Sequence, residues 1–380
     1  MPFFEPEQDD YREIVRDFVD REVMPHYARW EAAGQVDPAV WRAAAQRGLL
    51  GLEVGPEYGG MGLRDWRFRL VVVEELGFAG AAALNTGFAA HDDLVLPAIQ
   101  GHGSEELRRR WLPRMATGES VGAIALTEPG AGSDLRAIRT RAVAAGDDWV
   151  LDGQKAFVSN GSLAEVLVVA ASTDGGKSLT LFALDVDTPG IDRGHHLDKL
   201  GLRAQDTVEV FLTDCRVPAG NVLGEVGDGL AILRRLLPRQ RLAQAAISWA
   251  EAAGALRWAE DHVFARRAFG QRIGDFQNTR FTLAEIETGL DVTRSYLERC
   301  VDRLDDGTLS PVEAAKAKWW AGEQAVAAVS GLLQLFGGYG FMEEYPIARA
   351  FRDSRVQTIY AGATEVMKEL IGRDIARRHH

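Results

Sequence analysis

The 380-residue sequence contains little cysteine, no long apolar run and no excess of positive charge. Only Cys215 and Cys300 are present, so a disulfide framework is not expected and a reducing compartment is favoured. No uncharged apolar stretch approaches the length that crosses a membrane. The first residues lack the basic and apolar segments of a secretory signal. We therefore expect a cytoplasmic protein without a membrane span.

The charge balance excludes one class of partner. The chain has 55 acidic and 43 basic residues, which gives a formal net charge of −12. Such a surface argues against non-specific nucleic-acid binding, although it permits local basic patches for an anionic ligand. An apolar content of 46% with 26% charged residues is typical of a folded protein. The length exceeds what one hydrophobic core usually fills, so we expect two or three domains.

Apolar residues recur at helical spacing toward both ends of the chain. In the first third, Ser104 is the predicted N-cap of a helix that Pro113 ends. In the last third, Ser310–Glu313 forms a capping box, and Gly337–Gly338 is the predicted end of the helix that it opens. Both ends are therefore expected to be helical.

The middle of the chain changes to short β-prone runs separated by turn signals such as Asn-Gly and Thr-Pro-Gly. No helix-length amphipathic pattern lies between the runs, so a small antiparallel barrel or sandwich is expected rather than a parallel sheet. The runs are Trp149–Leu151, Val166–Val169, Leu179–Leu184 and Val208–Phe211. The predicted fold class is α+β, with a helical domain over 1–120, a β-domain over 121–230 and a helical domain over 231–380.

The densest motif is the run Ala125–Asp134, which reads Ala-Leu-Thr-Glu-Pro-Gly-Ala-Gly-Ser-Asp. Its small residues bring backbone amides close to a flat or anionic ligand, and Thr127 and Ser133 supply hydroxyl groups. A tight loop that joins the helical domain to the first strand is the alternative interpretation. Loop chemistry alone favours that alternative, so the motif gains weight only from its partners.

The second motif, Gly153–Gly161, alternates and ends in an Asn-Gly turn, which predicts a strand and a turn. Phe157 and Ser159 are two positions apart and so lie on the same face of a strand. This arrangement suits stacking beside a ring system, with a hydrogen bond to the edge of the ring. A core phenylalanine with a surface serine is the alternative.

Two further motifs lie in the last third. Three glycines in Gln334–Phe341 let the backbone approach another surface closely, although a helix C-cap and a turn are the alternative. The pair Arg266 and Arg267 offers two guanidinium groups to a diphosphate. A solvated basic helix end is the alternative for that pair.

Together these segments resemble the acyl-CoA dehydrogenase family over essentially the whole chain. The Thr-Glu-Pro-Gly-Ala-Gly-Ser-Asp loop is one diagnostic stretch. The other is the Gln-x-x-Gly-Gly-x-Gly-Phe run, followed by Glu344, Arg349 and Asp353. The segment Ile359–Leu370 is similar to the long-chain and bacterial branches.

The resemblance implies a helical N-terminal domain, a central β-domain and a C-terminal four-helix bundle, assembled as a homotetramer or dimer. It implies FAD between the β-domain and the bundle, completed by a neighbouring subunit. It also implies an acyl-CoA or acyl-carrier-protein substrate and an electron-transfer flavoprotein as a possible acceptor. No metal site is predicted.

The resemblance also assigns contacts by position. Phe157 stands beside the flavin ring and Ser159 stands at flavin N5. The flavin or thioester contacts on the preceding loop are Leu126, Thr127 and Ser133. The diphosphate and adenosine contacts are Arg266 and Gln277, with Gln334, Gly337 and Gly338 across the subunit interface. Ala363 and Glu365 are further FAD positions, and the substrate positions are Ser133, Arg241 and Gly362.

The pattern breaks at the catalytic base. In the family, a glutamate removes the α-proton of the thioester while the β-hydrogen passes to the flavin as hydride, and this glutamate occupies one of two places. Here the two places hold Ala361 and Gln240. Glutamine keeps the shape and hydrogen bonding of glutamate but cannot take up a proton. The sequence therefore leaves the catalytic base unknown.

His91, Asp92 and Asp93 lie in a stretch that runs near the acyl pocket in the family, so they are candidates for a substitute base. Ordinary surface acids at a helix start are the alternative. Three functions stay open. The first is FAD-dependent α,β-dehydrogenation of an acyl thioester through a relocated or weak base. The second is altered chemistry on the same fold, such as flavin oxygenation, elimination or cyclisation. The third is a catalytically impaired acyl-binding flavoprotein.

Overall fold

The computed structural model describes residues 3–176 and 178–379. Its N-terminal part is helical, because apolar stripes such as the fully buried Val15 and Phe18 face one another. Two π-helical turns, Val19–Val23 and His91–Val95, interrupt the helices. The helices are α1 (Pro6–Phe18), α2 (Met24–Ala33), α3 (Ala39–Gln46), α4 (Trp66–Phe78), α5 (Ala82–Ala90), α6 (Leu96–His102) and α7 (Glu105–Ala116).

Helix α7 begins as predicted and ends later than predicted. The Ser104 hydroxyl accepts a hydrogen bond from the Leu107 N–H at 3.3 Å, which is the N-cap contact. Pro113 lies inside the helix, so the predicted end at that proline is wrong. Proline removes its own backbone hydrogen bond, but Leu112 and Met115 on either side of it are fully buried. Their packing keeps the last turn helical.

The middle of the chain forms an eight-stranded sheet in the order β6-β7-β3-β2-β4-β5-β8, with β1 beside β4. Most neighbours are antiparallel, as predicted, but β1 and β2 each pair with β4 in parallel. The four β-prone runs fall in β3, β4, β5 and β7. The strands are β1 (Val121–Ala125), β2 (Arg141–Ala145), β3 (Asp148–Ser159), β4 (Ala164–Thr173), β5 (Ser178–Asp185), β6 (Ile191–Arg193), β7 (Thr207–Pro218) and β8 (Val222–Leu223).

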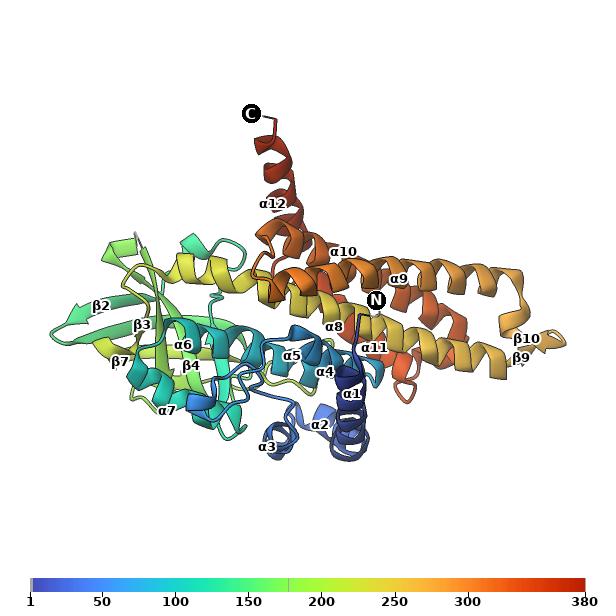
Figure 1. Cartoon of the computed structure of the whole chain (residues 1–380), viewed down its shortest axis with the longest axis horizontal. Helices are drawn as coiled ribbons and strands as arrows, with labels where there is room; N and C mark the ends of the chain where they lie inside the picture. Colours follow the sequence, from blue (N-terminus) through green and yellow to red (C-terminus); the bar gives the residue numbers. More distant parts are fainter. Residues whose placement is uncertain (1–2, 177, 380) are drawn as a thin grey trace.

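The C-terminal part is organised around one long helix. Helix α8 has 37 residues, and at about 1.5 Å per residue it is about 55 Å long. The sheet lies at one end of α8 and the hairpin of β9 and β10 lies at the other (Figure 1). Helix α12 projects from the body of the molecule. The elements are α8 (Gly229–Ala265), β9 (Arg267–Ala268), β10 (Gln271–Arg272), α9 (Gln277–Asp305), α10 (Pro311–Phe336), α11 (Pro346–Ser354) and α12 (Thr364–Arg377).

The predicted capping box at the start of α10 is confirmed. The Glu313 N–H donates to the Ser310 hydroxyl at 3.1 Å, and the Glu313 carboxylate accepts from the Ser310 N–H at 3.2 Å. The helix ends at Phe336, and Gly337 follows with a φ of 57°. That positive φ favours glycine, which explains why the helix stops there.

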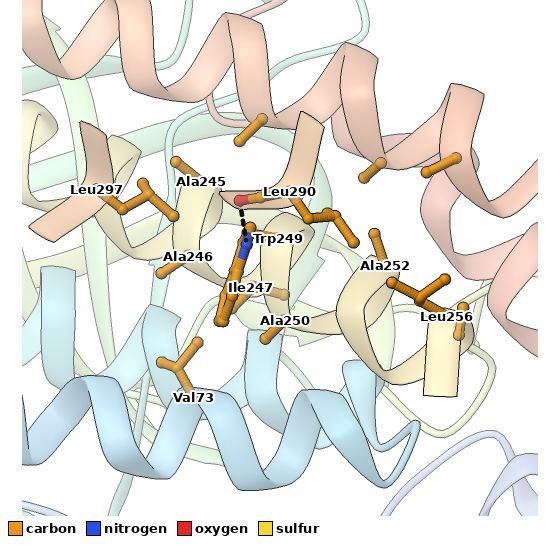
Figure 2. Packing of buried hydrophobic residues seen from close by; sticks show 14 of the residues in the cluster. Val73, Ala245, Ala246, Ile247, Trp249, Ala250, Ala252, Leu256, Leu290 and Leu297 are labelled. Atoms are coloured by element: carbon orange, nitrogen blue, oxygen red, sulfur yellow. Dashed lines mark hydrogen bonds between the residues drawn. The ribbon is translucent and has the colours of Figure 1, made fainter. Parts of the chain in front are cut away.

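The largest core joins α8 to α4, α9 and α10. Trp249 donates from Nε1 to the Leu290 carbonyl at 3.0 Å, so its ring is fixed between α8 and α9 (Figure 2). Small residues allow α4 and α8 to approach closely: a Cβ on Gly77 would lie 2.5 Å from the Ala250 Cβ. The N-terminal helices and the C-terminal helices therefore share one core. No helix in residues 3–176 and 178–379 combines the length and the low charge that a bilayer crossing needs.

Candidate active site

The Thr127 loop is fixed against strand β3. The Ala156 N–H donates to the Thr127 carbonyl at 2.9 Å. The buried Glu128 carboxylate accepts from Lys155 Nζ at 2.7 Å and from the Thr140 N–H at 2.9 Å. Burial alone raises the pKa of Glu128, but the hydrogen bonds from Lys155 and Thr140 outweigh it and hold this pKa below its ordinary value. Sequence reasoning missed this ion pair, although its two members lie in the first two motifs.

The outer part of the same loop is open. The space beyond the Cα atoms of Gly130 and Gly132 contains no protein atom within 4 Å of an added Cβ, and Ser133 is exposed. Leu126 packs against the same buried cluster as Leu237, which places the loop beside the first half of α8. An open, glycine-rich surface beside a fixed loop suits close contact with a ligand.

Phe157 and Ser159 lie at the end of β3 next to this loop. The pairing of β3 with β7 shifts between Lys155 and Val158, and Phe157 has a φ of 56°. Phe157 is 68% exposed, so the core-phenylalanine alternative is wrong. A bulky residue with positive φ costs about 1–3 kcal/mol and is typical of functional sites. Ser159 is half-buried on the same strand end.

The two base positions meet at one corner. Arg241, next to Gln240 on α8, is buried, and a Cβ on Gly362 would lie 3.7 Å from its Nε. Ala361 directly precedes Gly362 and has a φ of 55°. The Gly362 carbonyl accepts from the buried Lys318 Nζ at 2.6 Å. Burial, together with the nearby Arg241 charge, lowers the pKa of Lys318 to about 8.

This corner contains unmatched polar atoms and no acid at either base position. The Gln240 Oε1 and the Arg241 Nε are buried, and neither has a hydrogen-bond partner in the part of the chain that the structure describes. Unpaired buried polar groups are uncommon and point to a ligand or to bound solvent. The corner can therefore hold and orient a polar group, but Gln240 and Ala361 cannot accept a proton from it.

A buried polar network lies behind Ala361 and was not expected from the sequence. The Gln357 Oε1 accepts from the Ser248 hydroxyl at 2.8 Å and from the Tyr360 hydroxyl at 3.1 Å. The Gln357 Nε2 donates to the Glu251 carboxylate at 3.4 Å. Burial raises the pKa of Glu251 well above its ordinary value. The sequence signal for this network was Glu251, a carboxyl group among the apolar residues of α8.

The candidates for a substitute base lie in a buried π-helical turn, so the surface-acid alternative is wrong. The His91 Nδ1 accepts from the Gly122 N–H at 2.9 Å, and its other ring nitrogen faces the Met115 carbonyl at 3.3 Å. Burial lowers the pKa of His91 to about 4. Both ring nitrogens of His91 are already used by the backbone.

The two aspartates of this turn differ. Asp93 accepts from Trp66 Nε1 at 3.0 Å, from Arg69 Nε at 3.1 Å and from Arg239 Nε at 3.2 Å, so its carboxylate is fully engaged. Asp92 accepts from the Gly51 N–H at 3.1 Å. Burial raises the pKa of Asp92 to about 7. This contact ties Asp92 to the N-terminal loop at Gly51.

The remaining predicted FAD contacts gather at the opposite end of α8. The Arg266 guanidinium lies 5.5 Å from the centre of the Tyr339 ring. Gly337 and Gly338 are exposed and open to solvent. This second group, beside the β9–β10 hairpin, consists of Arg266, Gln277, Gln334, Gly337 and Gly338. The structure thus divides the predicted contacts into two groups that one extended helix separates.

The residues after the Gln334–Phe341 run serve the fold. The buried Asp353 carboxylate accepts from the Leu202 N–H at 2.6 Å, which ties the β-domain to α11. Arg349 pairs with Glu31 at 3.5 Å. These contacts explain the Arg and Asp of the motif as links between domains.

Comparison with known families covers almost the whole chain. The models of the N-terminal, middle and C-terminal domains of acyl-CoA dehydrogenase match residues 5–119, 123–215 and 227–376. The chain belongs to the acyl-CoA dehydrogenase family. It is therefore an FAD-dependent flavoenzyme that acts on the CH–CH group of acyl thioesters, and the predicted fold class is confirmed.

Individual members of the family are similar over most or all of their length. The mitochondrial long-chain specific acyl-CoA dehydrogenase of Sus scrofa is 40% identical over 98% of this chain and 87% of that protein. The crystal structure of an acyl-CoA dehydrogenase from Geobacillus kaustophilus is 40% identical, with a TM-score of 0.95 and 98% of both chains covered. A chain from a structure of the electron transferring flavoprotein of Acidaminococcus fermentans is 32% identical, with a TM-score of 0.95 over 99% of this chain and 100% of that one.

The residues present fit the cofactor of the family. Phe157 offers an exposed ring face, Gly130 and Gly132 leave room for close approach, and Arg266 is an exposed cation. Ala363 and Glu365 follow Gly362 at the start of α12, and Glu365 is exposed. An aromatic face, an open glycine loop and an arginine are what a flavin ring and a diphosphate require.

Proposed function

We propose that this acyl-CoA dehydrogenase family member oxidises the Cα–Cβ bond of an acyl thioester slowly, because neither position that holds the base in the family carries a carboxylate. One observation supports this proposal. The fold brings Arg241 next to Gly362, and neither of the residues that precede them, Gln240 and Ala361, carries a carboxylate. FAD, when bound, accepts the β-hydrogen as hydride. The α-proton leaves to water or hydroxide, without the positioning that a carboxylate side chain gives.

The chain's own residues hold the thioester. Arg241 and Gly362 bind and orient it at the corner, with Ser133 of the open loop on the other side. Gln240 retains the hydrogen-bonding shape of the family glutamate, so it orients the substrate without taking its proton. Phe157 would contact the flavin ring, and Ser159 would hydrogen-bond to its edge. Binding is therefore retained while proton transfer is not.

We also propose that FAD is shared between two copies of the chain. The Thr127 group lies beside Leu237 in the first half of α8, and the Arg266 group lies at the far end of this helix, 29 positions or about 43 Å further along. One FAD then contacts the Thr127 group of one subunit and the Arg266 group of its partner. The hairpin end exposes Phe269, which is 95% accessible, and Phe341. Exposed apolar residues of this kind suit an interface in a homo-oligomer.

Three finer assignments belong to the same proposal. The thioester carrier is coenzyme A or an acyl-carrier protein, since the corner recognises only the thioester end. The electron acceptor is an electron-transfer flavoprotein. The protein acts in the cytoplasm, in keeping with its two buried, unpaired cysteines.

An anaerobic titration tests the proposed reaction. Purified yellow protein is mixed with acyl thioesters while the flavin absorbance is followed. A fast spectral shift followed by slow bleaching supports the proposal. A shift that never develops into bleaching points to an acyl-binding protein, and reduction only by an external reductase points to altered chemistry. Either of these last results would overturn it.

A further inference from the structure

A cavity with both apolar and charged walls lies next to Arg239, the residue that precedes Gln240 on α8. It has a volume of about 310 Å³ and opens between the N-terminal loop, α4, α6 and the first half of α8. Its walls include Glu53, Arg69, Asp92, Gln100 and Arg239. Arg239 immediately precedes Gln240 on α8, so the cavity wall reaches within one residue of the base position. The cavity is therefore placed to receive the part of the acyl group beyond the reacting carbons.

Arg69 is a buried charged group in the wall of this cavity. It is 3% exposed, and its Nε pairs with Asp93 Oδ2 at 3.1 Å. Its Nη1 and Nη2 are buried and find no acceptor among residues 3–176 and 178–379. Buried guanidinium donors almost always have acceptors. Two adjacent free donors on a rigid fork form a ready contact for an oxygen-bearing group.

Two other polar groups of the wall, Arg239 and Glu53, are held by ion pairs. Asp93, beneath the cavity, is fully engaged by Trp66, Arg69 and Arg239. Arg239 also pairs with Glu53 at 2.5 Å. These ion pairs hold both arginines in place, since each shares the Asp93 carboxylate. The Arg69 fork is thus fixed in orientation before a ligand arrives.

Gln100 adds a buried hydrogen-bond acceptor without a donor, whereas the unpaired groups of Arg69 are donors. Its Nε2 donates to the Glu53 carbonyl at 3.2 Å, whereas its Oε1 is buried and has no donor within the described part of the chain. A hydroxyl group both accepts and donates, so it can satisfy Arg69 and Gln100 together. A carboxylate can take both Nη donors of Arg69.

We infer that this cavity binds the distal end of the acyl group, and that this end carries an oxygen acceptor, either a hydroxyl or a carboxylate. The inference rests on the proposed function, because it assigns the substrate class of the same site. A saturated alkyl end would leave Arg69 and Gln100 unpaired in contact with hydrocarbon, which is unfavourable. Sites built to hydrogen-bond a substrate group reject the analogue that lacks it. The long alkyl chain is therefore excluded as the preferred acyl group.

Calorimetric binding of thioether analogues tests the inference, because a thioether lacks the carbonyl and does not react. Three coenzyme A thioethers of equal chain length are compared, ending in methyl, hydroxyl or carboxylate. The FAD-loaded protein is expected to bind the hydroxyl or the carboxylate analogue at least about 10-fold more tightly than the methyl analogue. The polar analogue that binds more tightly identifies the acceptor group at the end of the acyl chain. Tightest binding of the methyl analogue, or of a longer alkyl thioether, would overturn the inference.

Variants locate the effect. In Arg69→Met the preference for the polar analogue is expected to fall to within about 3-fold. Because that change leaves Asp93 with one fewer partner, Arg69→Met combined with Asp93→Leu and the milder Gln100→Met are measured beside it. Each is expected to reduce the preference. A preference that survives in all three folded variants contradicts the inference. The flavin titration decides the reaction separately: bleaching without a tail preference refutes only the tail assignment.

Discussion

Two polar regions flank the first half of α8, and they differ in whether their buried polar atoms have partners. At the Thr127 loop, Glu128 and Lys155 satisfy each other in the protein interior. At the base corner, Gln240 and Arg241 carry buried atoms without partners, and no acid faces them from either base position. The first region is complete in itself, while the second is complete only with a ligand. A scaffold that positions a flavin can thus persist where proton transfer has been lost.

Placing an acid at the corner tests this contrast and has the largest expected effect. Gln240→Glu is expected to raise turnover of a suitable thioester by about 10²–10⁴-fold, because a positioned base contributes that much. The measurement is the steady-state rate with an artificial electron acceptor. Ala361→Glu introduces an acid at the second base position, and a smaller gain is expected there. Gln240→Leu is the matched control and should give none. A folded, FAD-loaded Gln240→Glu protein without any gain contradicts the assignment of this corner.

Breaking the satisfied region should cost stability. Lys155→Met leaves the Glu128 carboxylate buried and unpaired, so the free energy of unfolding is expected to fall by about 3–5 kcal/mol. Denaturant unfolding measures it. The control is Arg141→Met, whose exposed pair with Asp152 at 3.3 Å is worth about 0–1 kcal/mol. Equal losses in the two variants would show that the loop is not held by its ion pair.

The π-helical turn His91–Val95 offers a pH test, since burial shifts the pKa of His91 and the pKa of Asp92 in opposite directions. Burial lowers the pKa of His91 from 6.5 to about 4. The stability that neutral His91 gives is fully present above pH 6.5 and is lost as the pH falls toward 4, by up to about 3 kcal/mol. Unfolding free energies at several pH values measure this loss. His91→Asn should flatten the acid side of the profile.

Asp92 should give the opposite slope. Burial raises the pKa of Asp92 from 3.8 to about 7, so the folded protein favours the protonated acid. Its contribution is fully present below pH 3.8 and is lost as the pH rises through 7. Asp92→Asn should therefore reduce the loss of stability between pH 4 and 7, and no change in that window would contradict the assigned burial effect.

The smallest expected effect concerns the exposed ring at the loop. Phe157→Leu removes an aromatic face but keeps an apolar side chain. We expect FAD to bind more weakly by about 1 kcal/mol, which is the usual worth of an aromatic contact. Fluorescence of free and bound FAD measures the affinity. The Phe269→Leu variant tests the hairpin end in the same way, and unchanged affinity in Phe157→Leu would show that its ring does not cover the flavin.

The sequence predicted the helices and strands better than it predicted the contacts between them. Helical spacing and the Ser310 capping box located α10, and the turn signals located β3, β4, β5 and β7. The prediction that a helix ends at Pro113 was wrong, because packing of Leu112 and Met115 outweighs the one backbone hydrogen bond that proline removes. These are local questions, and local patterns answer most of them.

The sequence patterns did not predict the buried polar contacts, because the residues in contact are far apart in the sequence. Asp92 and Asp93 looked like surface acids, but Arg69 and Arg239 meet Asp93 inside the molecule. Glu251 likewise finds Gln357 across more than a hundred positions. The candidate site came from motifs and from family resemblance, since no spacing rule brings Gln240 beside Ala361.

The most direct test of the missing base is single-turnover flavin reduction by an acyl thioester carrying deuterium at Cα. The account predicts that the unmodified protein binds the thioester at once, bleaches slowly, and bleaches several-fold more slowly still with the deuterated substrate. Rapid bleaching at neutral pH, with or without an isotope effect, would mean that an efficient base acts at this site, and would contradict the account.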